Sequence, residues 1–269
     1  LILFVRGQLS DPSANSIAVV GTRLATNYGK LTTERYAEAF VRAGAIVTSG
    51  MAYGIDRAAH YAAMKAGGKT YAVIASGLDR ISPQESQKVA DEIIDSGGAI
   101  ITEYSFGTVA RPAYFPRRNR IVSGISRATL VVESRAKGGA LITAQFAFDQ
   151  NRDLFAVPGR ITDEKSSGCN MLIKKNMAQP TTEPNDILES LGLLNGNSKQ
   201  GSKSANREIH FATKTEKTVY DALSFDPLHI DELSLRTEIE ISELLVVLLK
   251  MEFDSTIRQL PGKHYIRMQ

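Results

Sequence analysis

Short apolar runs alternate with longer amphipathic stretches over the first two thirds of the chain. The runs are rich in Val, Ile and Ala, as expected of strands buried on both faces: Ser16–Val20, Ile46–Ser49, Thr70–Ile74, Ala99–Thr102, Ala128–Val132 and Asp153–Val157. Patterns typical of helices lie between them, at residues 28–42, 55–66, 84–96 and 141–151, with a further arginine-bearing helix after residue 102. This alternation predicts an α/β fold with a doubly wound, mostly parallel sheet.

A polar segment separates this region from a smaller one. Residues 195–206 are rich in Gly, Ser and Asn and lack an apolar period, which predicts a flexible linker. The pattern of a winged helix follows, with three helices and a hairpin, at residues 214–223, 230–235, 242–251, 254–257 and 263–266. We therefore predict a Rossmann-like domain at residues 1–194, a linker at 195–212 and a winged-helix domain at 213–269.

The polar and glycine-containing loops should gather on one edge of the predicted sheet. In doubly wound sheets, ligands bind at the carboxyl ends of the strands, where the loops enter the helices. The loops with candidate chemistry all follow strands, at residues 21–23, 49–56, 77–79, 114–120 and 134–143. We expect the functional site at this edge.

The most basic of these loops is the run Tyr114-Phe-Pro-Arg-Arg-Asn-Arg120. Proline favours the first turn of a helix, so the arginines are expected near a helix N-terminus, where the partial charge is already positive. This arrangement favours a bound anion such as phosphate. The aromatic rings of Tyr114 and Phe115 favour nucleic acid, because unpaired bases stack on such rings. The structural alternatives are a solvated basic turn and a phenylalanine in the core.

Three further loops add candidate phosphate ligands. Gly21, Thr22 and Arg23 directly follow the first strand, where small residues allow close approach and a guanidinium suits phosphate. The alternative for Arg23 is a structural salt bridge. Ser49, Gly50 and Gly54 are candidates for a second phosphate. Lys137 with Gly138, and Thr143 in the following helix, are candidates at the same rim.

Acidic residues and a histidine lie in the same loops. Asp56 and His60 are spaced i and i+4 on one predicted helix. They allow an acid–base dyad, but no nucleophile or metal set accompanies them, which favours a hydrogen bond that fixes the loop. Glu103 and Glu133 each follow a strand and are predicted to orient the arginines.

The charge distribution and the cysteine content exclude some classes of function. The net charge of +3 is uneven: residues 213–269 hold 7 Lys/Arg and 10 Asp/Glu, which leaves 25 and 19 for residues 1–212, so the two parts carry −3 and +6. A polyanion is therefore expected to bind the first part. The single cysteine, Cys169, excludes an internal disulfide and a cysteine metal cluster, and no apolar run is long enough for a membrane span. We expect a cytoplasmic protein with no metal and no cofactor.

Two nucleotide-binding patterns fail on their context. Residues 63–70 approximate a phosphate-binding loop, but they end a helix and open a strand, whereas a true loop of this kind connects a strand to a helix. No GxGxxG motif follows the first strand, which argues against a nicotinamide dehydrogenase.

Several ordered motifs resemble the bacterial DNA-processing protein A (DprA/Smf) family. They cover the predicted large domain: residues 18–23 (AVVGTR), 49–56 (SGMAYGID), 72–79 (AVIASGLD), 102–104 (TEY), 115–121 (FPRRNRI), 131–133 (VVE), 141–144 (LITA) and 157–159 (VPG). The last third resembles the winged-helix domain that many members carry. Two sites depart from the family pattern, because Ser82 stands where tyrosine is common and Gly138-Gly-Ala140 replaces Ser-Gly-Ser.

The resemblance implies a protein without enzymatic activity. Members bind single-stranded DNA, protect incoming DNA and load the RecA recombinase during natural transformation, commonly as homodimers through the Rossmann-like domain. It implies that Arg23 is a pocket arginine and that Arg117, Arg118 and Arg120 form a basic patch. Together, the residues and the resemblance predict DNA contacts at Gly21, Thr22, Arg23, Ser49, Gly50, Gly54, Phe115, Arg117, Arg118, Asn119, Arg120, Lys137, Gly138 and Thr143.

Two other function classes stay open from the sequence. One is a nucleotide-processing hydrolase of the phosphoribohydrolase type, with Glu103 or Glu133 catalytic, although that family's Pro-Gly-Gly-x-Gly-Thr loop is absent. The other is a scaffold without nucleic acid. The acidic winged-helix region is predicted to contact protein rather than DNA, since its third helix contains only Lys250 as a cation.

Overall fold

The computed structural model describes residues 2–10, 15–194, 211, 213–254, 256–260 and 262–267. Apart from residue 211, the predicted linker at 195–212 lies outside the described residues. The chain forms two compact units, Leu1–Asn197 and Ser198–Gln269. They are called the α/β unit and the winged-helix unit below.

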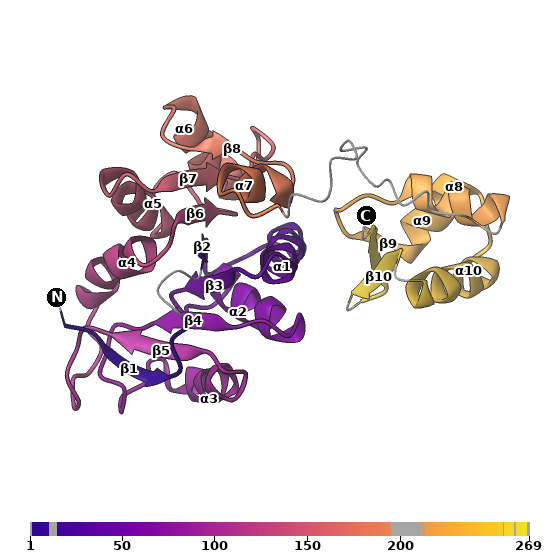
Figure 1. Ribbon diagram of the computed structural model, residues 1–269. Coiled ribbons are helices and arrows are strands. Elements are labelled where there is room, and N and C mark those ends of the chain that lie inside the picture. Colours follow the sequence, from indigo (N-terminus) through magenta and orange to yellow (C-terminus); the bar gives the residue numbers. More distant parts are fainter. Residues whose placement is uncertain are drawn as a thin grey trace. The chain divides into compact units, whose positions relative to one another are not determined.

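An eight-stranded sheet forms the centre of the α/β unit, in the order β1-β5-β4-β3-β2-β6-β7-β8 (Figure 1). The strands are β1 (Phe4–Gly7), β2 (Ser16–Val20), β3 (Ile46–Ser49), β4 (Thr70–Val73), β5 (Ala99–Thr102), β6 (Ala128–Val131), β7 (Asp153–Ala156) and β8 (Gln179–Pro180). Only β1 pairs antiparallel, with β5. The predicted doubly wound, mostly parallel sheet is confirmed.

The strand order reverses between β2 and β6. From β2 the chain adds β3, β4 and β5 in one direction, and β6 then pairs with the free side of β2 and begins the other direction. Loops that leave two such strands pass to opposite faces of the sheet and leave a crevice between them. The loops after β2 and β6 are therefore the place where a ligand is expected.

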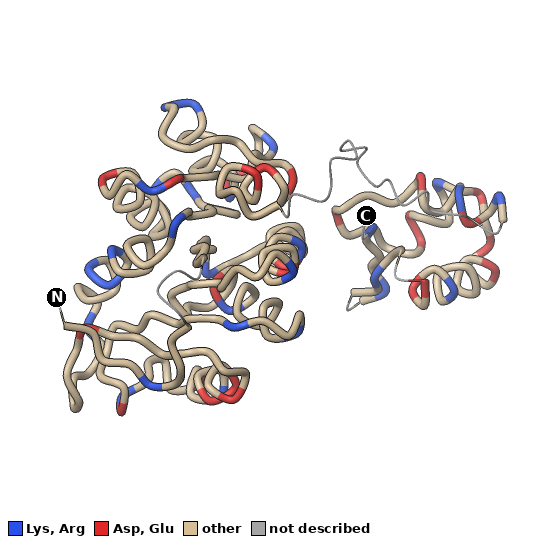
Figure 2. Tube along the Cα trace, in the orientation of Figure 1, with Lys and Arg blue, Asp and Glu red and all other residues tan. Residues whose placement is uncertain are grey.

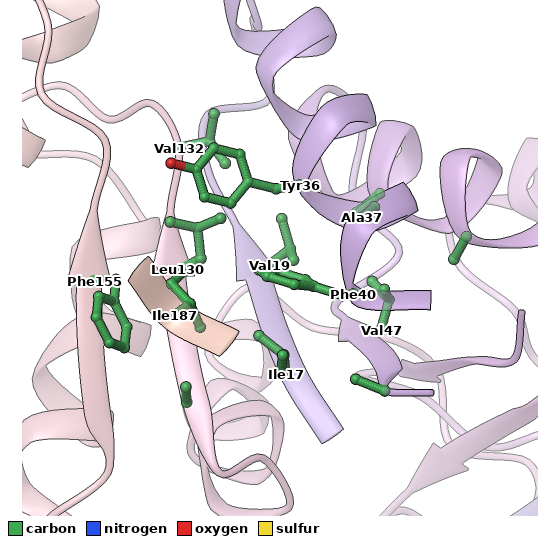
Figure 3. Packing of buried hydrophobic residues seen from close by; sticks show 14 of the residues in the cluster. Ile17, Val19, Tyr36, Ala37, Phe40, Val47, Leu130, Val132, Phe155 and Ile187 are labelled. Atoms are coloured by element: carbon green, nitrogen blue, oxygen red, sulfur yellow. The ribbon is translucent and has the colours of Figure 1, made fainter. Parts of the chain in front are cut away.

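Helices cover both faces because residues along each central strand alternate between two cores. Ile17 and Val19 of β2 pack with α1 (Asn27–Arg42), α2 (Ile55–Lys65) and α7 (Pro184–Ser190), and Figure 3 shows Tyr36 and Phe40 of α1 in this cluster. Ala18 and Val20 belong to the opposite core. The helices of that core are α4 (Tyr114–Gly124), α5 (Ala140–Asp149) and α6 (Ser167–Lys174). Helix α3 (Gln87–Asp95) covers the ends of β4 and β5.

Four elements of this unit had no counterpart in the sequence prediction, namely β1, β8, α6 and α7. Two short 3-10 helices, η1 (Gln84–Ser86) and η2 (Glu164–Ser166), precede α3 and α6. Helix α7 starts with a reciprocal cap between Glu183 and Asp186, and Pro184 occupies its first turn.

The described part of the second unit has three helices and a three-stranded sheet in the order β10-β11-β9. Its elements are α8 (Lys214–Ala222), β9 (Leu228–His229), α9 (Ile230–Thr237), α10 (Ile241–Phe253), β10 (Ile257–Leu260) and β11 (His264–Arg267). The predicted winged helix is confirmed, with β9 as an additional short strand. None of the described helices combines the length and the apolar character needed to cross a bilayer.

Candidate nucleic-acid interface

Arg23 and Phe115 meet at the carboxyl edge of the sheet, although they are far apart in sequence. The guanidinium carbon of Arg23 lies 5.5 Å from the centroid of the Phe115 ring. Arg23 is exposed in the loop after β2, and Phe115 is half-buried in the first turn of α4. A cation placed over an aromatic ring leaves the charge open to solvent and orients it. A side chain suited to phosphate and a ring suited to a base thus meet at one point of the edge.

The backbone around Arg23 is fixed by its neighbours. The Thr22 amide donates to the Glu133 carbonyl at 2.8 Å, and the Ile55 amide donates to the Thr22 carbonyl at 3.2 Å. Gly54 begins α2 with φ +78°, and a Cβ added there would lie 2.6 Å from the Arg23 carbonyl oxygen. The loops after β2 and β3 are therefore packed backbone to backbone, which Gly54 alone permits.

Two arginines of α4 share one carboxylate. Arg117 Nε lies 3.7 Å from Glu103, and Arg120 pairs with the same side chain. The Arg117 side chain remains 65% exposed, whereas the Arg120 side chain is 30% exposed. Glu103 thus orients the arginines, as predicted, and leaves Arg117 directed to solvent. Figure 2 shows the resulting cluster of basic positions on α4.

Arg118, which was predicted to contact DNA, lies beneath this surface and not on it. Its side chain is buried, with 4% exposure, and its Nη1 donates to the Gly50 carbonyl at 2.6 Å and to the Val73 carbonyl. Burial lowers its pKa to about 10, so it stays charged at neutral pH. Asp56, also buried, is its counter-charge. Arg118 therefore connects the carboxyl ends of β3 and β4 from inside the α/β unit.

Several other predicted contacts also point inward. Ser49 is fully buried and donates its hydroxyl to the Val19 carbonyl at 2.6 Å. The Gly50 carbonyl is occupied by Arg118, and Thr143 has 2% exposure. Asn119 is half-buried, and its side-chain oxygen accepts from Arg118 Nε at 3.2 Å. Ser49, Gly50 and Thr143 are buried beneath the surface of the edge and support it.

The loop after β6 supplies an accessible cation. Lys137 is exposed, and the Gly138 amide donates to the Arg135 carbonyl at 2.9 Å. Arg135 pairs with Glu164 at 3.3 Å. A side chain at Gly138 would collide with the Ser134 hydroxyl, so glycine keeps this turn tight before α5.

Glu133 has a partner other than the predicted arginines. Its carboxylate is buried, with 1% exposure, and accepts from the Thr26 amide at 2.9 Å and from the Thr26 hydroxyl. Thr26 in turn caps α1 by accepting from the Gly29 amide. Glu133 therefore joins the loops after β2 and β6 at the strand reversal. With Glu103 held by two arginines, both candidate catalytic carboxylates serve to fix the edge.

Asp56 and His60 do not form a dyad. Asp56 accepts from the Ala52 amide at 3.3 Å and so fixes the loop, as predicted. His60 Nδ1 lies 2.7 Å from the Thr70 hydroxyl, which itself donates to the Val47 carbonyl. The proton is therefore on His60 Nδ1, and burial lowers the pKa of His60 to about 3. Burial also raises the pKa of Asp56, against the opposing effect of Arg118.

The histidine makes a pH dependence testable. Below its ordinary pKa of 6.5, His60 takes up a proton in the unfolded chain but not in the folded one. Stability is therefore lost as the pH falls from about 6.5 towards 3, at about 1.4 kcal/mol per unit. Between about pH 7 and pH 5, the wild type should lose about 2 kcal/mol more than His60→Asn, measured by urea unfolding. Equal losses in the two proteins would contradict a neutral His60.

Two half-buried tyrosines and two exposed apolar side chains extend the edge, and of these the sequence analysis had named only Tyr114 as a candidate contact. Tyr104 and Tyr114 stack at 4.5 Å between centroids, and Arg111 lies 6.0 Å from the Tyr114 ring. Phe106 is 67% exposed in the loop after β5, and Leu24 is 69% exposed next to Arg23. The available signal was the pair Tyr104 and Phe106, two and four positions after the predicted strand 99–102. Among the described residues, no group of three His, Cys, Asp or Glu is placed to hold a metal ion.

Comparison with known proteins identifies the family. Residues 1–192 match the model of DNA recombination-mediator protein A, and residues 203–263 match the DprA winged helix domain. The chain is 32% identical to protein Smf of Synechocystis over 99% of this chain and 74% of that protein. It is 37% identical to DNA processing protein DprA of Streptococcus pneumoniae over 70% of this chain and 66% of that protein. It spans half of Escherichia coli protein Smf, at 40% identity.

Solved structures agree with this match. The X-ray structure of S. pneumoniae DprA aligns with a TM-score of 0.65 at 38% identity, over 70% of this chain and 65% of that chain. DNA processing protein A of Helicobacter pylori, described for its unique single-stranded DNA binding mode, aligns with a TM-score of 0.64 at 29% identity, over 70% and 86% of the two chains. The strand reversal, the motifs along its edge and these matches together place the chain in the DNA recombination-mediator protein A (DprA/Smf) family.

Proposed function

We propose that this protein binds single-stranded DNA along the carboxyl edge of its α/β unit and acts as a recombination mediator without catalytic activity. The observation that carries the proposal is the pairing of Arg23 with Phe115 at the strand reversal. A guanidinium binds phosphate without reading sequence, and an aromatic ring stacks any unpaired base. A double helix hides the faces of its bases, so this combination favours a single strand.

The cations define a path rather than a closed pocket. Arg117 is exposed in α4, Arg23 lies beside Phe115, and Lys137 is exposed in the loop after β6. Because β6 adjoins β2 in the sheet, these loops are neighbours on one edge. A row of spaced cations with interleaved rings suits an extended polyanion. The single-stranded DNA binding mode described for the H. pylori relative supports the same ligand.

Membership of the family supports a more specific role, location and assembly. We propose that the protein protects incoming DNA and loads RecA recombinase during natural transformation, that it works in the cytoplasm, and that it forms a homodimer through the α/β unit. The alternative, a phosphoribohydrolase, is disfavoured because Glu103 and Glu133 are both held by internal partners. Release of free base from nucleoside monophosphates would support that alternative instead.

The test is oligothymidine binding by charge-removal variants at two salt concentrations. Arg23→Ala and Arg117→Ala should each weaken binding to all sequences and reduce the salt slope by about one. Phe115→Ala should weaken binding by roughly 1–3 kcal/mol with an unchanged salt slope. The matched control is Arg42→Ala, an exposed arginine at the last turn of α1, which should bind as the wild type. Unchanged affinity in both Arg23→Ala and Arg117→Ala would refute the proposed edge.

A further inference from the structure

Helix α10 has two apolar faces, and only one of them lies in the core. Leu244, Leu248 and Met251 have at most 2% exposure and pack in the core of the winged-helix unit. From the sequence, the apolar run of this helix indicated that it is mostly core. The structure instead leaves five large apolar residues of α10 on the surface: Ile241 43%, Leu245 44%, Val246 70%, Leu249 58% and Phe253 82% exposed.

Four of these residues form a continuous stripe. Ile241, Leu245, Leu249 and Phe253 are spaced four residues apart, so they follow one side of the helix over about 18 Å. Isolated exposed apolar residues are ordinary, but a contiguous row on one helix marks an interaction surface. This row is called the α10 stripe below.

The segment that contains the stripe is acidic. From Ile230 to Asp254 the chain has seven Asp or Glu and two Lys or Arg, a net charge of −5 (Figure 2). Both cations have acidic partners, since Arg236 contacts Glu232 at 2.6 Å and Lys250 contacts Glu216 at 2.7 Å. This surface therefore repels DNA and anionic lipid, although α10 is the third helix of the winged helix, the one that reads DNA in DNA-binding versions of the fold.

Charge also distinguishes between a second copy of this protein and a different partner protein as the ligand of the stripe. A second copy of this segment would bring two net charges of −5 together, which is unfavourable. The polar segment 195–206 contains no apolar side chain larger than alanine, so it cannot cover the stripe. An amphipathic helix with an apolar row and flanking Lys or Arg complements both the apolar stripe and the negative charge of this segment.

We propose that the α10 stripe is a docking surface for a cationic amphipathic helix of a partner protein. This proposal does not depend on DNA binding, which we propose for the α/β unit. The third helix of the winged helix here recognises protein, with apolar contacts for affinity and acidic residues for selection of the partner.

The experiment uses the full chain and a model ligand. A Leu/Lys peptide of about 14 residues, with leucines on one helical face, is titrated by fluorescence anisotropy beside a Leu/Glu peptide of the same pattern. The Leu/Lys peptide should bind and the Leu/Glu peptide should not. The double variant Leu245→Gln/Leu249→Gln should weaken Leu/Lys binding at least about tenfold. Glu252→Gln, which removes the carboxylate on the stripe side of α10, should weaken it severalfold and make it less salt-dependent.

The control is Phe225→Gln, a half-exposed aromatic residue between α8 and β9, which should leave binding unchanged. Circular dichroism confirms that each variant is folded. Absence of Leu/Lys binding, or binding unaffected by Leu245→Gln/Leu249→Gln, would overturn the proposal. Equal binding of the Leu/Glu peptide would remove the charge argument. Self-association that Leu245→Gln/Leu249→Gln abolishes, or binding to anionic vesicles, would assign the stripe to a different occupant.

Discussion

Replacing Arg118 by alanine is expected to lower the free energy of unfolding of the α/β unit by about 3–5 kcal/mol. The substitution removes the counter-charge of the buried Asp56 and leaves the carbonyls of Gly50 and Val73 without their donor. Removing one member of a buried pair costs more than the pair contributes, because the other charge remains in the interior. Urea unfolding followed by near-UV circular dichroism measures the change.

Arg117→Ala is the matched control, since it removes the same group one position earlier in the same helix. Arg117 is largely exposed, so its loss should change stability by less than about 0.5 kcal/mol while weakening DNA binding. The two neighbouring arginines are thus expected to separate stability from binding. Should Arg118→Ala keep full stability and lose DNA affinity as Arg117→Ala does, the internal role assigned to Arg118 would be incorrect.

Gly54→Ala is expected to destabilise the α/β unit by roughly 2–6 kcal/mol, the combined effect of backbone strain and overpacking. Gly54 has φ +78° and ψ −124°, a conformation that is essentially restricted to glycine. The added Cβ would meet the carbonyl oxygens of Thr22 and Arg23. The loop that carries Arg23 must then shift, so affinity for oligothymidine should fall at least as far as in Arg23→Ala.

The control for this substitution is Gly67→Ala. Gly67 also has a positive φ, +75°, but a Cβ there meets nothing within 4 Å. It should cost about 1 kcal/mol through strain alone and leave DNA binding intact. Similar losses of stability in Gly54→Ala and Gly67→Ala would show that the contact with the Arg23 loop contributes nothing.

The fold was predictable because its signal is local and repeated. Apolar runs and helical periods specify a parallel sheet covered on both faces, and the predicted strands at 16–20 and 128–132 proved to be the adjacent central strands. The missed elements are short. Strand β1 has four residues and derives its pairing from β5, nearly a hundred positions away, and β8 has two. No period can emerge from so few positions.

The site was predictable as an edge but not residue by residue. The sequence places Arg117, Arg118 and Arg120 in one basic run and treats them alike. Tertiary packing distinguishes them, because α4 lies against the sheet and turns Arg118 inward. A signal existed, since Arg118 precedes the buried Ile121 and Val122 by three and four positions and therefore lies on the apolar side of the helix. A charge at that position indicates an internal partner, here Asp56.

Asp56 of α2 and Arg118 of α4 are buried opposite charges carried by helices on opposite faces of the sheet. It follows that the basic helix is not a portable module. If residues 114–124 were transferred to an unrelated sheet, the buried Arg118 would have no counter-charge. An aspartate would have to be placed on the opposite face of that sheet. A designer who wants this basic segment in another protein must transfer Asp56 and its helix together with it.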